Sequence, residues 1–315
     1  MADKAKLLVL CGPTATGKTS LSIALAKQLD GEIICADSMQ IYKGLVIGTA
    51  QATQDEMQGI PHHLTGFLPP DVRFSVADYV GMAQEAIADI TARGKLPIVV
   101  GGTGLYIKSL VEGIQFSKQK TDLSVRAALQ LQLEKEGIEP LFVRLMELDP
   151  QYANTLHPNN HGRVLRALEL YLQTGKTMSE QLAESRPAER PYKDTIISLH
   201  YTTREILYAH INARVDVMMA QGLLQEAQSV FAQRERYITA AQAIGYKEFF
   251  PYFMQTDALQ NCIEKLKQSS RNYAKRQITW FARMENLTWM MTDDADIVQH
   301  AMTLWHEKNA QRSVL

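Results

Sequence analysis

The stretch that decides the fold is Gly12-Pro13-Thr14-Ala15-Thr16-Gly17-Lys18-Thr19. It matches the pattern G-x-x-x-x-G-K-[ST], and it lies between an apolar run at residues 7–11, which predicts a buried strand, and residues 18–29, which predict a helix. The glycines let the backbone curl so that amide N–H groups point at phosphate oxygens, and the helix N-terminus adds its dipole. Lys18 supplies a positive charge, and the Thr19 hydroxyl can hold Mg²⁺. The stretch therefore predicts a phosphate-binding loop, or P-loop, without specifying ATP.

The first third of the chain alternates short apolar runs with helical patterns. Residues 33–36 and 96–100 predict two further strands, and residues 75–93 predict a helix that opens with the capping box Ser75-x-x-Asp78. Such strand–helix alternation is typical of a parallel sheet with helices on both faces. The expected fold is therefore α/β, a P-loop NTPase-like parallel sheet with flanking helices and a smaller, mainly helical insertion domain.

Two polar stretches bracket the expected insertion. Residues 112–121 predict a linker, and residues 176–194, with Pro187 and Pro191, predict an exposed connection. Between them, residues 122–137 and 161–174 have helical periodicity, and residues 141–146 are a candidate strand. Residues 196–201 predict another strand, and nearly everything from 203 to about 283 predicts helix. We therefore expect a catalytic core of residues 1–114 and 191–315, and a helical insertion domain of residues 115–190.

Composition indicates a globular protein. The 315 residues are 46% apolar and 21% charged, with a net charge of −1, so any nucleic-acid site must be local. Cys11, Cys35 and Cys262 show no metal-ligand spacing, and we expect them to be buried thiols suited to a reducing cytoplasm. No stretch approaches the length of a membrane span, and the N-terminal apolar run is too short for a signal peptide. We expect a cytoplasmic protein with no membrane partner.

Two segments after predicted strands are candidates for chemistry. Asp37 follows the second strand, at the edge that faces the ligand crevice in open parallel sheets, where it could bind Mg²⁺, act as a general base, or merely cap a turn. The third strand ends in Gly101-Gly102-Thr103-Gly104 instead of the acidic residue common in NTPases. The glycines favour either close approach of a ligand or a tight turn. His62-His63 does not form a metal signature, and we expect a structural or surface role.

Residues 265–283 predict a cationic, aromatic helix, with six basic residues and no acidic one. Lys267, Arg271 and Lys275 share one helix face, and Tyr273 is one of the interleaved aromatic residues. Such a helix can follow a nucleic-acid backbone and stack on bases. The alternative, which the short window by itself slightly favours, is a solvated face beside a buried aromatic stripe.

Segments across the whole chain together resemble one family, the tRNA dimethylallyltransferases or tRNA isopentenyltransferases. The matching segments lie between positions 12 and 283 and are GPTATGKT, ADSMQIYKGLVIGTA, GIPHHL, FSVADY, LPIVVGGTGLYIKSL, HPNNHGRVLRALELY with TGK, INARVD, QAIGYKE and YAKRQITWFAR. Thr16 stands where the family usually has Ser, and Asn160 where it usually has Asp. Because no zinc-finger tail precedes Leu315, the sequence resembles the compact bacterial form.

This resemblance implies transfer of a dimethylallyl group from dimethylallyl diphosphate to N6 of the adenosine immediately 3′ of the anticodon, in tRNAs that read codons beginning with U. The product is N6-isopentenyladenosine. The P-loop, Gly12 to Thr19, then holds the diphosphate leaving group with Mg²⁺ as cofactor, bound through Thr19. Asp37 matches the family's general base, Arg214 stabilises the charge growing on the diphosphate together with Lys18, and Thr103 supports the bridging oxygen or positions the donor.

The resemblance also implies a tRNA anticodon stem-loop as partner, with the target base swung out of the loop and inserted between the core and the insertion domain. The insertion domain, residues 115–190, is then expected to take part in tRNA binding. The expected tRNA contacts are Asp37, Ser38, Met39, Gln40, Thr103, Arg126, His161, Gly162, Arg163, Val164, Leu165, Gln242, Ala243, Ile244, Gly245, Tyr246 and Lys247. We expect a monomer. Two alternatives stay open at this level, a P-loop nucleotide or small-molecule kinase and a non-catalytic P-loop protein that binds RNA or acts as a switch.

Overall fold

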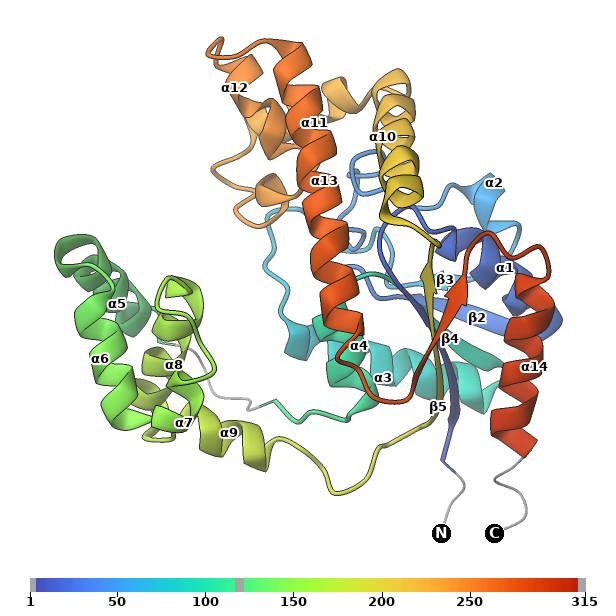
Figure 1. Ribbon diagram of the computed structural model, residues 1–315, viewed down its shortest axis with the longest axis horizontal. Coiled ribbons are helices and arrows are strands. Elements are labelled where there is room, and N and C mark those ends of the chain that lie inside the picture. Colours follow the sequence, from blue (N-terminus) through green and yellow to red (C-terminus); the bar gives the residue numbers. More distant parts are fainter. Residues whose placement is uncertain (1–3, 117–121, 311–315) are drawn as a thin grey trace. The chain divides into compact units, whose positions relative to one another are not determined.

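The computed structural model describes residues 4–116 and 122–310. The chain divides into two compact units, residues 1–111 with 191–315, and residues Glu112–Arg190 (Figure 1). The second unit lies where the sequence predicts an insertion over residues 115–190. Part of the predicted linker, residues 117–121, lies outside the described residues.

A parallel sheet forms the centre of the first unit, as predicted. Its strands run in the order β3-β2-β4-β1-β5-β6, and all pairings are parallel. The strands are β1 (Lys6–Cys11), β2 (Gly31–Cys35), β3 (His62–His63), β4 (Leu96–Val100), β5 (Lys193–His200) and β6 (Leu287–Met291). The strands β2, β3 and β4 lie on one side of β1, and the later strands β5 and β6 lie on its other side. The direction in which strands are added to the sheet therefore reverses at β1. In such sheets the ligand crevice lies at the carboxyl ends of the strands at this reversal.

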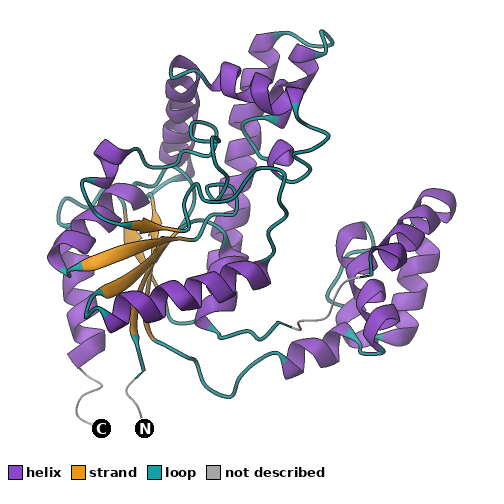
Figure 2. Ribbon diagram, turned by 180° about the vertical axis from the view of Figure 1, so that it is seen from behind, coloured by secondary structure: helices purple, strands orange, loops and turns teal. Residues whose placement is uncertain are grey.

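The central strands are apolar because both of their faces are covered. Every residue of β2 is buried, as is every residue of β1 after Lys6. Figure 2 shows the strands enclosed between helices. Leu8 and Leu10 pack with Leu25 of one helix and Trp305 of another in a single cluster. The sequence patterns predicted β1, β2, β4 and β5 to within a few residues. They did not predict β3, whose two histidines were expected in a loop, or β6, in which no residue is fully buried.

Helices of the first unit cover the sheet and continue above its carboxyl edge. Those against the sheet are α1 (Lys18–Gln28), α3 (Val76–Ala92), α4 (Gly104–Val111) and α14 (Ile297–Ala310), and α2 (Gln54–Met57) is a single turn. The others are α10 (Arg204–Ala220), α11 (Leu223–Ala232), α12 (Phe250–Phe253) and α13 (Leu259–Phe281), with short 3-10 turns η1 (Ala240–Gln242) and η2 (Lys247–Phe249). The predicted capping box of α3 is confirmed, since Ser75 accepts from the Asp78 amide.

The second unit is a helical cluster with its own core. Its helices are α5 (Leu123–Glu136), α6 (Glu139–Leu148), α7 (Pro150–Ala153), α8 (His161–Thr174) and α9 (Met178–Glu184). The strand predicted over residues 141–146 is wrong, because Leu141 and Leu145 are buried four residues apart on one face of α6. The exposed connection predicted over residues 176–194 instead contains α9, whose capping box pairs Thr177 with Glu180.

The three cysteines are free and buried, as expected. Burial raises the pKa of the Cys11 and Cys35 thiols to about 12, so neither is a reactive thiolate near neutral pH. Among the helices of the described residues, none has the length and apolar character needed to cross a membrane.

Candidate active site

A cavity of about 550 Å³ lies within the first unit, where the carboxyl edge of the sheet meets α10 and α13. Segments far apart in the sequence line it together. The predicted site residues among them are Thr14, Ala15, Thr16, Gly17, Lys18, Thr19, Asp37, Ser38, Met39, Gln40, Arg214, Gln242, Ala243, Ile244, Gly245 and Lys247. The fold thus brings the P-loop, Asp37 and Arg214 to a single cavity.

The P-loop backbone is held by hydroxyl groups on its outer side. The Tyr201 hydroxyl donates to the Ala15 carbonyl at 3.3 Å, and the Thr292 hydroxyl donates to the Thr16 carbonyl at 3.1 Å. Thr16 itself is fully buried and donates to the Pro13 carbonyl at 2.8 Å, so this departure from the family's usual Ser keeps a hydroxyl inside the loop. At Gly12, where φ is +130°, a Cβ would lie 2.7 Å from the Leu199 carbonyl oxygen, which restricts the position to glycine.

Lys18 and Arg214 share the cavity with one carboxylate, Asp37. The Lys18 ammonium donates to the carbonyls of Gly12 at 3.1 Å and Pro13 at 2.6 Å. Burial, and next the charge of Arg214, lower the pKa of Lys18 to about 8, and burial lowers the pKa of Arg214. Asp37 partly offsets both effects. Because mutual repulsion and burial both disfavour the two positive charges, an anion bound between Lys18 and Arg214 would stabilise them.

Asp37 both caps a turn and faces the cavity. Its Oδ1 accepts from the amides of Met39 at 2.9 Å and Gln40 at 3.3 Å, which fixes the carboxylate on the loop after β2. Oδ2 accepts no hydrogen bond from the residues that the structure describes. Capping the turn is therefore compatible with a role toward a ligand, because one oxygen holds the turn and the other is available to the ligand.

Thr103 supports this loop from the end of β4. Its hydroxyl accepts from the Ser38 amide at 3.0 Å, although Thr103 does not line the cavity. The glycines around it allow protein segments to approach closely. A Cβ on Gly101, Gly102 or Gly104 would lie 2.2 Å from Ala36, Gln277 or Trp280 respectively. Gly101 and Gly102 also line the cavity. These glycines are therefore closely packed against neighbouring segments and form part of the cavity wall.

Gln277 of α13 is a site residue that the sequence analysis did not single out. It is buried, its Oε1 accepts from the Thr14 amide at 3.0 Å, and its Nε2 donates to the Gly102 carbonyl at 3.0 Å. This amide therefore joins the P-loop to the loop after β4. The glutamine lies in the segment AKRQ, which resembles the family, but the resemblance assigned no role to it.

The cationic face of α13 is turned toward α10. Lys267, whose side chain is 14% exposed, pairs with Asp216 at 2.8 Å. Arg271 donates to Asn212 at 2.6 Å, and the Lys275 ammonium lies 5.7 Å from the Tyr208 ring. These contacts indicate a structural role for all three residues, on a face that packs against α10 and is not simply solvated as the alternative had it. Arg276, on another face of the helix, lines the cavity instead.

Other predicted tRNA contacts lie in the second unit, at the start of α8. His161, Gly162 and Arg163 are exposed there, whereas Val164 and Leu165 are buried in the core of that unit. Their side chains support the exposed residues and are not themselves presented to a ligand. In the same unit, the Arg126 guanidinium lies 3.7 Å from a carboxylate oxygen of Glu169.

Tyr246 is likewise buried, in the first unit, so its side chain is not presented to a ligand either.

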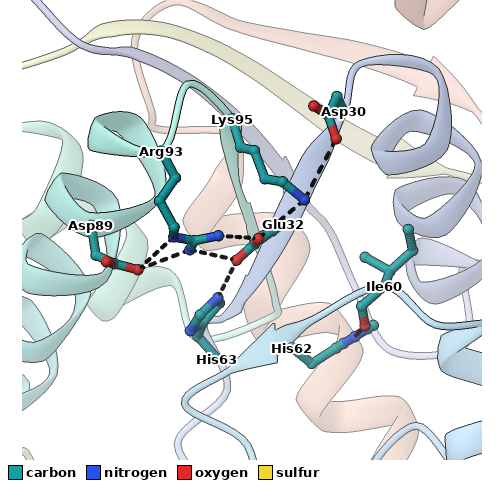
Figure 3. Close-up of polar contacts among 8 residues, drawn as sticks. All are labelled: Asp30, Glu32, Ile60, His62, His63, Asp89, Arg93 and Lys95. Atoms are coloured by element: carbon teal, nitrogen blue, oxygen red, sulfur yellow. Dashed lines mark hydrogen bonds and ion pairs between the residues drawn. The ribbon is translucent and has the colours of Figure 1, made fainter.

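His62 and His63 have structural roles, as expected, at the amino end of the sheet (Figure 3). His63 contacts the buried Glu32 carboxylate at 2.8 Å, and Arg93 binds both oxygens of that carboxylate. The Arg93 hydrogen bonds, above all, lower the pKa of Glu32 to about 2. His62 contacts the Ile60 carbonyl at 2.8 Å. Within residues 4–116 and 122–310, no group of three or more His, Cys, Asp or Glu residues is arranged to hold a metal ion.

Comparison with known proteins shows the family to which the chain belongs. The pattern of the family described as IPP transferase matches residues 40–284, and that described as isopentenyl transferase matches residues 5–63. The chain belongs to the tRNA dimethylallyltransferase family. A tRNA dimethylallyltransferase of Bacillus subtilis is 47% identical over 295 residues, 93% of each chain. One of Halalkalibacterium halodurans is 42% identical over 96% of each chain.

Solved structures of the family share the fold. The full-length tRNA isopentenylpyrophosphate transferase of Bacillus halodurans superposes with a TM-score of 0.73 at 39% identity, covering 98% of this chain and 100% of its own. A eukaryotic dimethylallyltransferase acting on tRNA gives a TM-score of 0.78 at 31% identity, covering 98% of this chain and 78% of its own. The chain is therefore a prenyltransferase-family enzyme, and the kinase alternative is not retained.

Proposed function

We propose that this enzyme transfers a dimethylallyl group from dimethylallyl diphosphate to N6 of the adenosine immediately 3′ of a tRNA anticodon, in tRNAs reading codons that begin with U. The observation that carries the proposal is the presence of Lys18 and Arg214 in one cavity with a single lining carboxylate, Asp37, beside the P-loop. A site with excess buried positive charge suits a diphosphate, and a carboxylate within the same cavity suits an acceptor that must lose a proton.

On the donor side, the bond between the allylic carbon and the diphosphate oxygen breaks, and the diphosphate leaves with the electron pair. Lys18 and Arg214 stabilise the charge that grows on it. The P-loop is already fixed by Tyr201, Thr292 and Gln277, so little reorganisation is needed when the donor binds. The Thr19 hydroxyl, which lines the cavity, is an oxygen donor of the kind Mg²⁺ prefers and would hold the ion. Bound there, Mg²⁺ would supply further charge neutralisation of the diphosphate.

On the acceptor side, the exocyclic amine of adenine is a weak nucleophile because its lone pair is delocalised into the ring. As its nitrogen bonds to the allylic carbon, the amine must release a proton. Asp37 Oδ2 is placed to accept that proton while Oδ1 stays on the turn amides. Ser38, Met39 and Gln40 line the cavity beside it and form the acceptor side of the site.

The proposal is tested by incubating the enzyme with labelled dimethylallyl diphosphate, Mg²⁺ and an unmodified tRNA that carries adenosine directly after its anticodon. We expect the label in that adenosine. A tRNA with guanosine at the same place is the matched control and should stay unlabelled. RNA binding without any label transfer would instead support the non-catalytic alternative.

A further inference from the structure

One wall of the cavity is formed by Gly48, Thr49 and Ala50, and a carboxylate outside the cavity lining holds this wall. Glu226 of α11 accepts three consecutive backbone amides. Its Oε2 binds the amides of Val46 at 2.9 Å and Ile47 at 3.0 Å, and its Oε1 binds the amide of Gly48 at 2.7 Å. Charge-assisted hydrogen bonds of this kind are among the stronger ones in proteins, so the loop's backbone is fixed by one side chain.

Tyr246 completes the arrangement from the segment after η1. Its hydroxyl donates to Glu226 Oε1 at 2.8 Å, and its ring lies against Gly48, where a Cβ would be 2.5 Å from a ring carbon. Burial, with the adjacent Glu226 carboxylate, raises the pKa of Tyr246, so the hydroxyl keeps its proton and remains a donor. At Gly245, where φ is +110°, a Cβ would lie 3.2 Å from the Gly48 carbonyl oxygen. These contacts hold together two walls of the cavity, residues 48–50 and residues 242–245.

The same loop is connected to Asp37 through Gln40. The Gln40 side-chain amide donates to the carbonyls of Thr49 and Ala50, each at 3.1 Å, while its backbone amide donates to Asp37 Oδ1 at 3.3 Å. A shift of the loop would therefore move Gln40, and with it the turn that orients Asp37. The P-loop is outside this chain of contacts.

We propose that Glu226 is a positioning residue for the acceptor side, which holds the Gly48–Ala50 wall through Val46, Ile47 and Gly48 and, through Gln40, keeps Asp37 oriented toward the acceptor amine. This inference rests on the proposed prenyl transfer to RNA. It assigns Glu226 an effect on the use of the acceptor and none on the binding of the donor diphosphate.

The test compares Glu226→Gln with Glu32→Gln in the full-length enzyme. Glu226→Gln keeps the size of the side chain but turns an N–H₂ group toward backbone amides. We expect kcat/KM for the RNA acceptor to fall about 10–100-fold, as misplacement of about 1 Å does elsewhere, with the Kd for inorganic diphosphate unchanged within about twofold. Glu32 is also a buried carboxylate with several partners, but at the amino end of the sheet (Figure 3). Glu32→Gln controls for lost stability alone.

A second variant and a second measurement keep the test independent of activity. Tyr246→Phe retains the ring and removes one hydrogen bond, so we expect a smaller loss of kcat/KM in the same direction. Amide hydrogen exchange at Val46, Ile47 and Gly48 should accelerate in Glu226→Gln and stay unchanged in Glu32→Gln.

Three results would overturn the inference: unchanged exchange at those amides, a loss of acceptor kcat/KM no larger than in Glu32→Gln, or an equal loss of diphosphate affinity. If the wild-type enzyme transfers no label to RNA, the proposed function itself fails. That outcome is distinct from an active wild type with an equally active Glu226→Gln variant.

Discussion

At the scale of single residues, the site depends on side chains that serve two partners at once. Asp37 uses one oxygen for a turn and presents the other to the cavity. Gln277 joins two loops with the two ends of one amide. Lys18 donates hydrogen bonds to carbonyls of its own loop and also lines the cavity. Each residue's contribution is therefore separable by a substitution that removes one of its functions and keeps the other.

Asp37 provides the first such separation. Asp37→Asn keeps an oxygen acceptor for the amides of Met39 and Gln40 but is not a base, whereas Asp37→Ala loses both functions. We expect both variants to lower the single-turnover rate by about 10²–10⁴-fold and to bind inorganic diphosphate almost as well as the wild type. Rapid-quench kinetics measures the rate. A near-normal rate in Asp37→Asn would remove Asp37 from the role of base.

The lowered pKa of Lys18 predicts that binding of the diphosphate leaving group depends on pH. Its pKa lies near 8 in the unliganded enzyme, below the usual 10.5, and a bound anion favours the protonated form. Diphosphate affinity should thus be nearly constant well below pH 8 and should fall as pH rises above it, by at most about tenfold per pH unit for one proton. Isothermal titration between pH 6.5 and 9.5 measures this. Lys18→Met should bind weakly with little change over that range, and a wild type equally flat would contradict the prediction.

At the scale of elements, the different faces of α13 have different neighbours. Its buried face includes Leu266 and Gln277, its cationic face packs on α10, and Arg276 lines the cavity. The spacing of Lys267, Arg271 and Lys275 predicted a shared face correctly. It did not indicate what that face contacts, because Asn212 of α10 lies 59 residues before Arg271 and the position of α10 is set by the fold.

A substitution series on α13 tests this division. Lys267→Ala should lower the free energy of unfolding by about 0.5–1 kcal/mol through loss of its ion pair and leave tRNA affinity unchanged within about twofold. Arg276→Ala removes the same charge from the cavity and should weaken substrate binding with little effect on stability. Chemical denaturation and filter binding measure the two quantities. Equal losses of tRNA affinity in both variants would show that the cationic face contacts RNA.

Glu32 links β2, β3 and α3 and predicts how the enzyme responds to acid. Its pKa is about 2 in the folded state and 4.5 ordinarily, so its stabilising contribution is fully present above pH 4.5 and is lost as pH falls toward 2. The shift corresponds to about 3 kcal/mol at most. Urea denaturation at pH 7, 4.5 and 3 should show this loss. Glu32→Gln should be less stable at pH 7 and should show a smaller decrease, and parallel pH curves would contradict the assignment.

At the scale of the whole molecule, two units carry different parts of the expected activity. The cavity, with the P-loop, Asp37 and Arg214, belongs entirely to the first unit. The second unit has its own core and exposes His161 and Arg163 at the start of α8. This distribution suits donor chemistry in the first unit and RNA contacts supplied by both.

Substitution of Arg163 tests whether the second unit contacts RNA. Arg163→Ala should weaken tRNA binding and reduce the slope of log affinity against log salt by about one, as loss of one phosphate contact does, without changing diphosphate affinity. Lys135→Ala removes an equally exposed charge from α5 of the same unit and is the matched control. Binding isotherms at several salt concentrations supply the slopes. The same slope in both variants and the wild type would exclude Arg163 as a phosphate contact.

The sequence by itself determined the features that depend on contiguous residues. The P-loop and its flanking strand and helix, the capping box at Ser75 and the apolar strands of the sheet depend on local periodicity and backbone geometry, which neighbouring residues fix. The family also followed from the sequence, because its motifs are short and specific. Residues 141–146 were mispredicted because a short apolar run fits a strand and a buried helical face equally well.

Only the tertiary structure decided which distant groups meet. Thr14 and Gln277 are 263 residues apart, and Gly48 and Glu226 are 178 apart, yet each pair is joined by a hydrogen bond. A sequence pattern does not contain these pairings, since they arise from packing of α11 and α13 against the loops at the sheet's carboxyl edge. For the same reason only the fold showed that Lys267 meets a carboxylate, that Tyr246 is a buried donor, and that the P-loop faces Arg214 and Asp37 in one cavity.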